Sequence, residues 1–452
     1  MSAPAALRSR ATSAAAALRA ERALAVVAGA TAVGAALRVA WVLVASRPPT
    51  NLYDPARYVG YAEGIARGHG MVEPLTGQPT AYFPPGYPWF LGVIDAVLVH
   101  TPLPDDLPLA AGLAQAVLGT ASIVLVAVLA RRLHSAAAGA VAAVGLALYP
   151  NLVLHTAALL SETLAIALLL GLLVALVPPP GDGPWPAGLG GRRLVAAGLL
   201  LGGVLLVRPV SAGVVLALAV SLLVARAGLR RTAAVVGAVA GIGVLCVLPW
   251  TARNAVRMDA FVPLSTNTGD NLCIGHGPGA TGGFRLAEDE CATGTGVQDG
   301  TEGELRNDEE KTRTALRLIR EGWRDEPGLV WDRFVATVDR DDDAVRAVQS
   351  YGDDPWISED RQLLLRRACG LAWRAVAVLG LVGLVRLARG RRGDRLLVPL
   401  AALGLLAAPL VTFGDARFKV PIVPLLIVAA AVAVTRRDGG QGSERTRSTE
   451  AV

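Results

Sequence analysis

The residues best able to do chemistry in this sequence are two carboxylates, Asp54 and Glu162, each at the edge of an apolar segment. A positioned carboxylate can take a proton from a hydroxyl group and so act as a general base. Cations at similar edges could bind a phosphate and stabilise charge on it; they are Arg208, Arg253, Arg417 and Lys419. Asn254, next to Arg253, and the tyrosines Tyr58 and Tyr82 complete the candidate set.

Each candidate also has an ordinary structural interpretation. Asp54 precedes Pro55, a pair that suits a helix start, with the carboxylate capping the first turn. Tyr58 follows one turn later on the same face. Arginines at a membrane edge often extend to lipid headgroups, and Glu162 could simply pair with one of them. The choice between chemistry and structure therefore depends on the elements that position these residues.

The composition is that of a polytopic membrane protein. Of 452 residues, 53% are hydrophobic, and the mean hydropathy is +0.47, above that of soluble domains. Apolar runs of about 15–24 residues alternate with arginine-rich loops. These loops account for the net charge of +6, which therefore does not indicate nucleic-acid binding. We expect an all-α bundle with about ten spans, at residues 23–45, 107–130, 136–149, 157–177, 194–207, 212–225, 232–248, 370–385, 396–412 and 420–434.

The arginines also predict the orientation, because basic loops stay on the cytoplasmic side. Arginine occurs in loops 131–134, 181–193, 226–231 and 386–395, and near both ends of the chain. With the N-terminus inside, the first span places residues 51–89 outside. A further full span at 83–100 would put every later basic loop outside. We therefore expect residues 83–100 to lie along the outer leaflet or dip into it, and the first external loop to contain juxtamembrane helices.

Residues 250–369 are too long for a simple connection. Amphipathic patterns at 304–323 and 327–348 predict a small external helical domain. Cys273 and Cys291 lie outside, where a disulfide can form, but the sequence does not fix their distance. The run Asp341-Asp342-Asp343 is expected to be a solvated helix end. We divide the chain into a cytoplasmic segment (1–22), a transmembrane module with the candidate site (23–249, external loop 46–106), an extracytoplasmic loop and helical domain (250–369), C-terminal transmembrane helices (370–435) and a disordered cytoplasmic tail (436–452).

Several motifs recur at the edges of the apolar runs: Asp54 and the helix after it, the proline run 83–88, Tyr149-Pro150 before Ser161-Glu162, Arg208-Pro209, Pro249-Trp250 before Arg253-Asn254, and Arg417 before Pro421. In their order and spacing, these motifs resemble the GT-C superfamily of glycosyltransferases, near the protein O-mannosyltransferases and the lipid A aminoarabinose transferases. The resemblance covers about residues 23–283 and the last external turn, but not the external helical region.

The resemblance implies an inverting transfer of a sugar from a polyprenyl phosphate to a glycan, lipid or protein acceptor, outside the cell membrane. Asp54 would deprotonate or orient the acceptor hydroxyl, and Glu162 would be a second carboxylate at the same cavity. The cations named above would hold the lipid phosphate. Two departures stand out: many relatives have an acidic pair where this chain has Asp54-Pro55, and aminoarabinose transferases have a lysine where Phe83 precedes Pro84.

Two questions stay open at this point. The two carboxylates could hold Mg²⁺ or Mn²⁺, although nothing in the sequence requires a metal. The alternative function is non-enzymatic, a flippase for lipid-linked sugars or a scaffold of cell-envelope assembly. A flippase should carry polar residues through the membrane interior, whereas the polar groups here gather on one side.

Overall fold

A computed structural model describes residues 3–50, 54–179, 185–285, 291, 299–389 and 392–437, with side chains in the first helix from residue 17. In these ranges the regular structure is helical, apart from isolated β-bridges at Val72–Pro79 and Gly283–Gly414. Residues 438–452 of the expected tail and residues 181–184 of an expected cytoplasmic loop lie outside the described ranges. The described chain is therefore all-α, as predicted.

Five helices are long and apolar enough to cross a membrane. They are α1 (Ala3–Ala45, apolar from Ala17), α4 (Leu107–Leu133), α10 (Leu229–Arg257), α15 (Glu359–Arg389) and α16 (Gly393–Val411). Shorter helices accompany them: α5 (Ala136–Ala147), α7 (Glu162–Leu176), α8 (Gly191–Val207), α9 (Gly213–Val224) and α17 (Val423–Val434). Each predicted span coincides with one of these helices, which confirms the prediction of a polytopic membrane protein.

The centre of the bundle is α17, whose residues Val423 to Val432 are all buried. It packs against α15, α5 and α4. Gly383 of α15 faces the Ala429 backbone, and a Cβ there would overlap it. Such small residues let membrane helices approach closely. The buried Arg38 of α1 donates through its two Nη atoms to the Leu146 and Ala147 carbonyls at the end of α5, so these two nitrogens are paired within the bundle.

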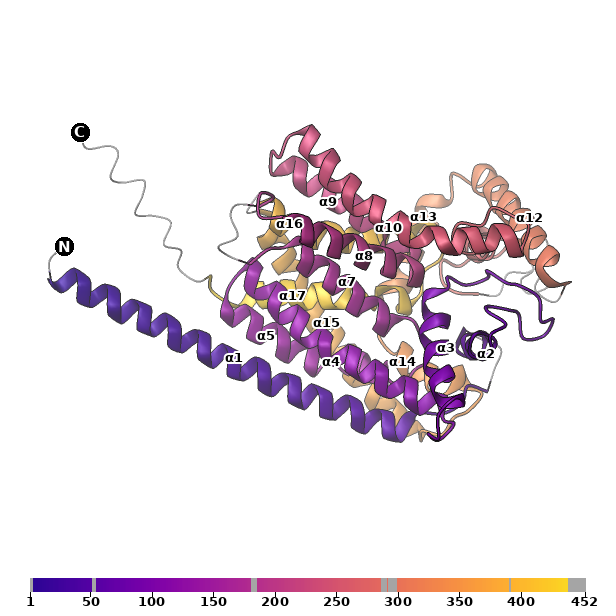
Figure 1. The fold of residues 1–452 in the computed structure, drawn as a ribbon, viewed down its shortest axis with the longest axis horizontal. Helices are drawn as coiled ribbons and strands as arrows, with labels where there is room; N and C mark the ends of the chain where they lie inside the picture. The colour runs from indigo at the N-terminus through magenta and orange to yellow at the C-terminus, as the bar shows by residue number, and fades with distance from the viewer. Residues whose placement is uncertain are drawn as a thin grey trace.

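The two ends of the bundle differ (Figure 1). The start of α1 and the end of α17 lie at one end, and α2 (Asp54–Ala66), α3 (Gly86–Val99) and α12 (Gly300–Glu321) lie at the other. An even number of spans would place these two helix ends in this way. The helix α3, within the segment expected to skim the membrane, packs mainly against α2 and makes smaller contacts with α4 and α8. This packing fits a segment that does not cross the bilayer.

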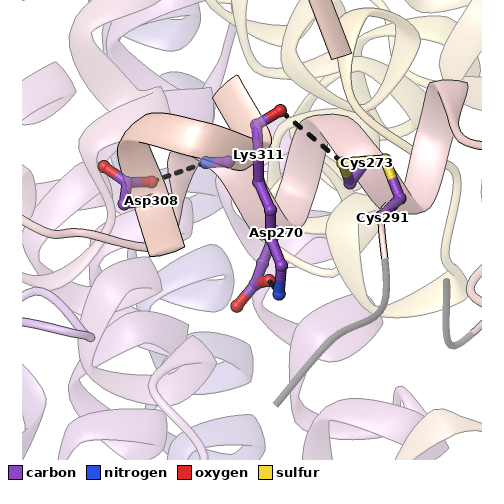
Figure 2. Close-up of a disulfide and its surroundings, with 6 residues drawn as sticks. Asp270, Cys273, Cys291, Asp308 and Lys311 are labelled. Atoms are coloured by element: carbon purple, nitrogen blue, oxygen red, sulfur yellow. Dashed lines mark hydrogen bonds and ion pairs between the residues drawn. A yellow bond between two sulfur atoms is a disulfide. The ribbon is translucent and has the colours of Figure 1, made fainter. Parts of the chain in front are cut away.

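The end that carries α2 and α12 is built from further short helices. Helix α11 (Thr268–His276) packs on α12, and the Cys273–Cys291 disulfide, which the sequence left open, is present beside the buried Asp270–Lys311 pair (Figure 2). Helix α13 (Glu326–Val338) packs on α16, and α14 (Asp343–Ala347) packs on α6 (Pro150–Leu154).

The prediction that Asp341-Asp342-Asp343 is a solvated helix end is wrong for its outer members. Asp341 and Asp343 are 1% and 4% exposed. Lys419 lies 3.1 Å from Asp341, which also accepts from the Tyr149 hydroxyl at 2.7 Å. Asp343 lies 3.5 Å from His155 Nε2. These carboxylates are buried because they pair with Lys419, Tyr149 and His155 of the bundle. The sequence pattern does not show these long-range partners.

Candidate active site

A cavity of about 1000 Å³ lies between the bundle and the short helices. Its wall comes from the start of α2, the end of α8, α11, α13, the end of α16 and η5 (Ala416–Lys419). The candidates that line it are Asp54, Tyr58, Tyr82, Arg208 and Arg417. Ser161 also lines it, immediately before Glu162. Residues from four distant parts of the sequence thus meet at one cavity.

Helix ends position the charged residues. Asp54 and Glu162 are the first residues of α2 and α7, where the helix dipole stabilises a negative charge. Arg208 follows the last residue of α8, and Pro209 starts the short helix η1 (Pro209–Ala212) directly after it. Arg417 lies in η5, between α16 and α17. Each side chain is therefore attached to the end of a rigid element.

The four charged side chains form one continuous ion-pair network. Arg417 Nη1 lies 2.5 Å from Asp54 Oδ2, and Arg417 Nε donates to Glu162 Oε1. Arg208 Nη1 donates to the same Glu162 oxygen at 2.5 Å. The Glu162 side chain is 0% exposed, whereas that of Asp54 is 35% exposed. Glu162 therefore anchors both guanidinium groups, and Asp54 is the carboxylate accessible to a ligand.

The fit of a divalent cation to this network is poor. Mg²⁺ and Ca²⁺ take about six or more oxygen ligands, and the two carboxylates are already neutralised by two arginines. Among the described residues, no group of three or more His, Cys, Asp or Glu could hold a metal ion. Glu162 Oε2 is a buried oxygen with no hydrogen-bond partner among the described residues, but one such atom is not a metal site.

The two candidate tyrosines lie in different surroundings. The Tyr58 ring packs against Phe83 and Tyr87, with centroids 4.9 and 5.0 Å away. Burial and then the charge of Asp54 raise the pKa of Tyr58, so its phenol stays neutral. The Tyr82 hydroxyl donates to Asp270 Oδ2 at 2.6 Å. Burial and then Asp270 raise the pKa of Tyr82 as well. Both phenols are therefore neutral polar groups in the cavity wall.

The structure does not bring Arg253 and Asn254 to this cavity. Arg253 donates to the carbonyls of Thr80 and Met71, at 2.9 and 2.5 Å, and Asn254 donates to that of Val262 at 2.9 Å. Arg253 instead lines a separate cavity of about 450 Å³. The contacts of Arg253 with the Met71 and Thr80 carbonyls join the segment between α2 and α3 to the C-terminal end of α10.

Lys419 is also absent from the cavity wall. It is 1% exposed, pairs with Asp341, donates to the Arg340 carbonyl and lies 5.0 Å from the centre of the Trp373 ring. These contacts occupy its ammonium group. Lys419 therefore joins the segment before α14 to η5, two residues after Arg417.

Sequence reasoning missed several residues in the cavity wall. Asp415 accepts from the Arg417 backbone N–H at 2.8 Å and so fixes the turn that carries Arg417. Its place two residues before Arg417 in an external turn was a usable signal. Asp270, Asp343 and Tyr351 also line the cavity. Asp343 and Tyr351 belong to the region that the family resemblance does not cover, whereas Asp270 lies within the covered residues. The sequence pattern assigned none of the three to the cavity.

No protein-family model and no curated protein matches the sequence. The structure is similar to the archaeal oligosaccharyltransferase AglB from Archaeoglobus fulgidus in complex with an inhibitory peptide and a dolichol-phosphate, with 14% identity, a TM-score of 0.52, and coverage of 91% of this chain and 50% of that one. It is also similar to ArnT from Cupriavidus metallidurans bound to undecaprenyl phosphate, with 16% identity, a TM-score of 0.51, and coverage of 91% of this chain and 59% of that one.

The chain thus spans 50% to 59% of the length of these two solved structures. At this identity the likeness shows the fold alone. The fold is the GT-C fold that the sequence resemblance implied, and that prediction is confirmed.

Proposed function

We propose that the chain is an inverting GT-C glycosyltransferase that takes a sugar from a polyprenyl-phosphate donor. The acceptor is a cell-envelope glycan, lipid or protein, on the extracytoplasmic side of the plasma membrane. The observation that carries the proposal is an ion-pair network in which Asp54, Arg208 and Arg417 line one large cavity and the buried Glu162 lies behind them. The dolichol-phosphate and undecaprenyl phosphate in the two similar structures support the donor class.

In the proposed reaction, the acceptor oxygen attacks the anomeric carbon of the donor sugar from the face opposite the phosphate. A new C–O bond forms as the C–O bond to the phosphate breaks, and the phosphate oxygen keeps the electron pair. The acceptor proton passes to Asp54, which is the accessible carboxylate of the network. A single displacement of this kind inverts the anomeric configuration.

The ion pairs suggest how charge moves during this step. Without ligand, two arginines and two carboxylates balance. When Asp54 accepts the proton it loses its charge, while the departing phosphate gains one. Arg417 is then released from Asp54 and can pair with the phosphate. The guanidinium thus exchanges one anion for another as the transition state forms, and no step needs a metal ion.

The non-enzymatic alternative is less well supported. A flippase needs a polar route across the bundle, whereas α17 at its centre is an unbroken apolar run from Val423 to Val434. The buried Arg38 is engaged by the carbonyls of Gly34, Leu146 and Ala147. The cavity with its charged residues lies at one end of the bundle. These observations favour an enzyme with its site at one end of the bundle over a flippase that moves lipid-linked sugars across the membrane.

The decisive experiment places the purified protein in nanodiscs with polyprenyl-phosphate sugars, and separately in liposomes that carry the same donor. The proposal expects loss of donor and formation of an equal amount of polyprenyl phosphate when an envelope extract is added as acceptor. Movement of intact donor between leaflets without such turnover would instead support the flippase. Mass spectrometry of envelope glycans from a deletion strain would then identify the missing sugar and its acceptor.

A further inference from the structure

We infer that the Tyr82 phenol binds the sugar part of the ligand, because Asp270 and Lys311 fix this phenol as a hydrogen-bond acceptor. This inference rests on the proposed function and names a specificity residue for the same cavity. The sequence placed Tyr82 among the candidate substrate- or phosphate-binding residues without choosing between the sugar and the phosphate. The argument starts from the direction of one hydrogen bond.

A tyrosine hydroxyl has one proton to donate. The Tyr82 hydroxyl donates its proton to Asp270 Oδ2 at 2.6 Å. The other Asp270 oxygen accepts from Lys311 Nζ at 2.7 Å. A carboxylate paired with an ammonium group is ionised and can only accept hydrogen bonds. The direction of the bond is therefore fixed, and the phenol oxygen offers only its lone pairs to any further partner.

The surrounding structure holds this arrangement rigidly. Asp270 lies on α11, three residues before Cys273, whose disulfide to Cys291 ties that helix down. Figure 2 shows Asp270 and Lys311 side by side next to this disulfide. Asp270 and Lys311 are each 5% exposed. Water therefore competes little for either bond, and the pair is a fixed support for the phenol.

The backbone before Tyr82 is fixed from the same side. Glu304 of α12 accepts from the Thr80 hydroxyl at 2.6 Å and from the Ala81 N–H at 3.0 Å. The Arg57 guanidinium lies 4.7 Å from the centre of the Tyr82 ring. Ring, backbone and hydroxyl are thus each held by a different group. The phenol cannot turn to donate elsewhere without breaking a charge-assisted hydrogen bond.

An acceptor of this kind selects the chemistry of its ligand. The oxygens of a phosphate diester or monoester anion need donors, which Arg208 and Arg417 supply in the same cavity. Sugar hydroxyl groups, or an ammonium group on an amino sugar, can donate to the phenol. Tyr82 and Asp54 both line the cavity wall. We therefore assign the Tyr82 side of the cavity to the sugar and the arginine side to the phosphate.

The test compares two kinds of probe on the full chain in nanodiscs. The first is farnesyl phosphate, and the second is farnesyl phosphate carrying mannose, glucose or arabinose. The ratio of their dissociation constants measures how much the sugar adds to binding. In Tyr82→Phe this ratio should fall about tenfold for the best sugar, with the affinity for farnesyl phosphate within about twofold of wild type. Tyr61→Phe is the matched control, because the Tyr61 hydroxyl also donates to a buried carboxylate, Glu73, but does not line the cavity.

A second variant tests the support. Replacing both Asp270→Asn and Lys311→Gln removes the two opposite charges without changing the net charge, and it lets the Tyr82 proton point elsewhere. The ratio of the two dissociation constants should fall in this variant, although the phenol is still present. The thermal midpoint of unfolding is measured to check that the variant is folded. An equal loss of affinity for farnesyl phosphate and its sugar conjugates in Tyr82→Phe would overturn the inference. So would wild-type binding of farnesyl phosphate with no gain from any sugar. A wild-type chain that binds no probe would refute the proposed function itself, and the inference with it.

Discussion

Arg417 Nη1 donates to Asp54 Oδ2 at 2.5 Å, across a separation of 363 residues in the chain. The contact joins the start of α2 to η5 and occupies the Asp54 carboxylate with a cation. In the proposed function, a donor phosphate that binds Arg417 replaces Asp54 as its partner and leaves the Asp54 carboxylate free for the acceptor hydroxyl.

Asp54→Asn should reduce transfer by about 100- to 10,000-fold, because the amide keeps the shape of the carboxylate but cannot take a proton. The loss should appear in kcat, whereas the affinity for farnesyl phosphate should hold or rise, since Arg417 loses a competing anion. The measurement is turnover with saturating donor in nanodiscs. Glu63→Gln is the control, because Glu63 lies on the same helix with only an exposed partner, Arg67. Wild-type turnover in Asp54→Asn would rule out this residue as the base.

Arg417→Lys should be nearly as damaging as Arg417→Gln, although it keeps the charge. The guanidinium contacts Asp54 through Nη1 and Glu162 through Nε, and a single ammonium group lacks this planar, forked geometry. We expect a fall in kcat of about 100- to 1,000-fold in both variants. Binding of farnesyl phosphate should weaken as well. An Arg417→Lys variant with wild-type kcat would show that charge alone suffices there. Arg67→Gln, directly after α2, is the control for the loss of an arginine at the same end of the bundle.

The sequence was sufficient to predict the bundle and to name the four charged residues that meet in the ion-pair network of the candidate site. Hydropathy located the spans because apolar length is imposed by the bilayer. Asp54, Glu162, Arg208 and Arg417 were predictable because each lies where an apolar run ends. Their convergence could be expected from topology, since all were placed on one side of the membrane. The pattern did not show that Glu162 is fully buried and shared by two arginines.

The residues that were misjudged depend on contacts made far away in sequence. Lys419 and Arg253 have the same local signature as Arg417, a cation at the edge of an apolar run. Their positions differ from that of Arg417 because Lys419 pairs with the buried Asp341, and Arg253 donates to the carbonyls of Met71 and Thr80. A sequence pattern reports the residue type but not its partner. The partner of each cation determines whether the residue lines the cavity, as Arg417 does, or is held elsewhere in the fold.

Lys419→Met should therefore affect stability more than chemistry. It would leave Asp341 buried without its cation, and removing one member of a buried ion pair costs about 3–5 kcal/mol. Adding Asp341→Asn should restore much of this loss, because the amide can still accept from Tyr149. Unfolding in mild detergent would measure both variants. Glu309→Gln, which breaks an exposed pair with Arg313, should change the free energy of unfolding by less than about 1 kcal/mol. The prediction would be contradicted if the single variant Lys419→Met kept its stability but failed to bind farnesyl phosphate. Lys419 would then belong to the phosphate-binding residues.

The orientation of the whole bundle can be tested through helix α7. Arg132 Nη1 donates to the carbonyls of Val174 and Val177, both at 2.6 Å, at the C-terminal end of this helix, whereas Glu162 begins it. The site and Arg132 therefore mark opposite ends of one apolar segment. Because basic loops stay inside, a reporter fused after Arg132 should be cytoplasmic, and one inserted after Gly77 in the first external loop should be extracytoplasmic. Cysteine labelling in intact cells at the same two positions checks the fusions independently. An extracytoplasmic signal after Arg132 would show that the candidate active site lies on the cytoplasmic face. A donor on the outer side of the membrane could not reach it there, and the predicted orientation would be wrong.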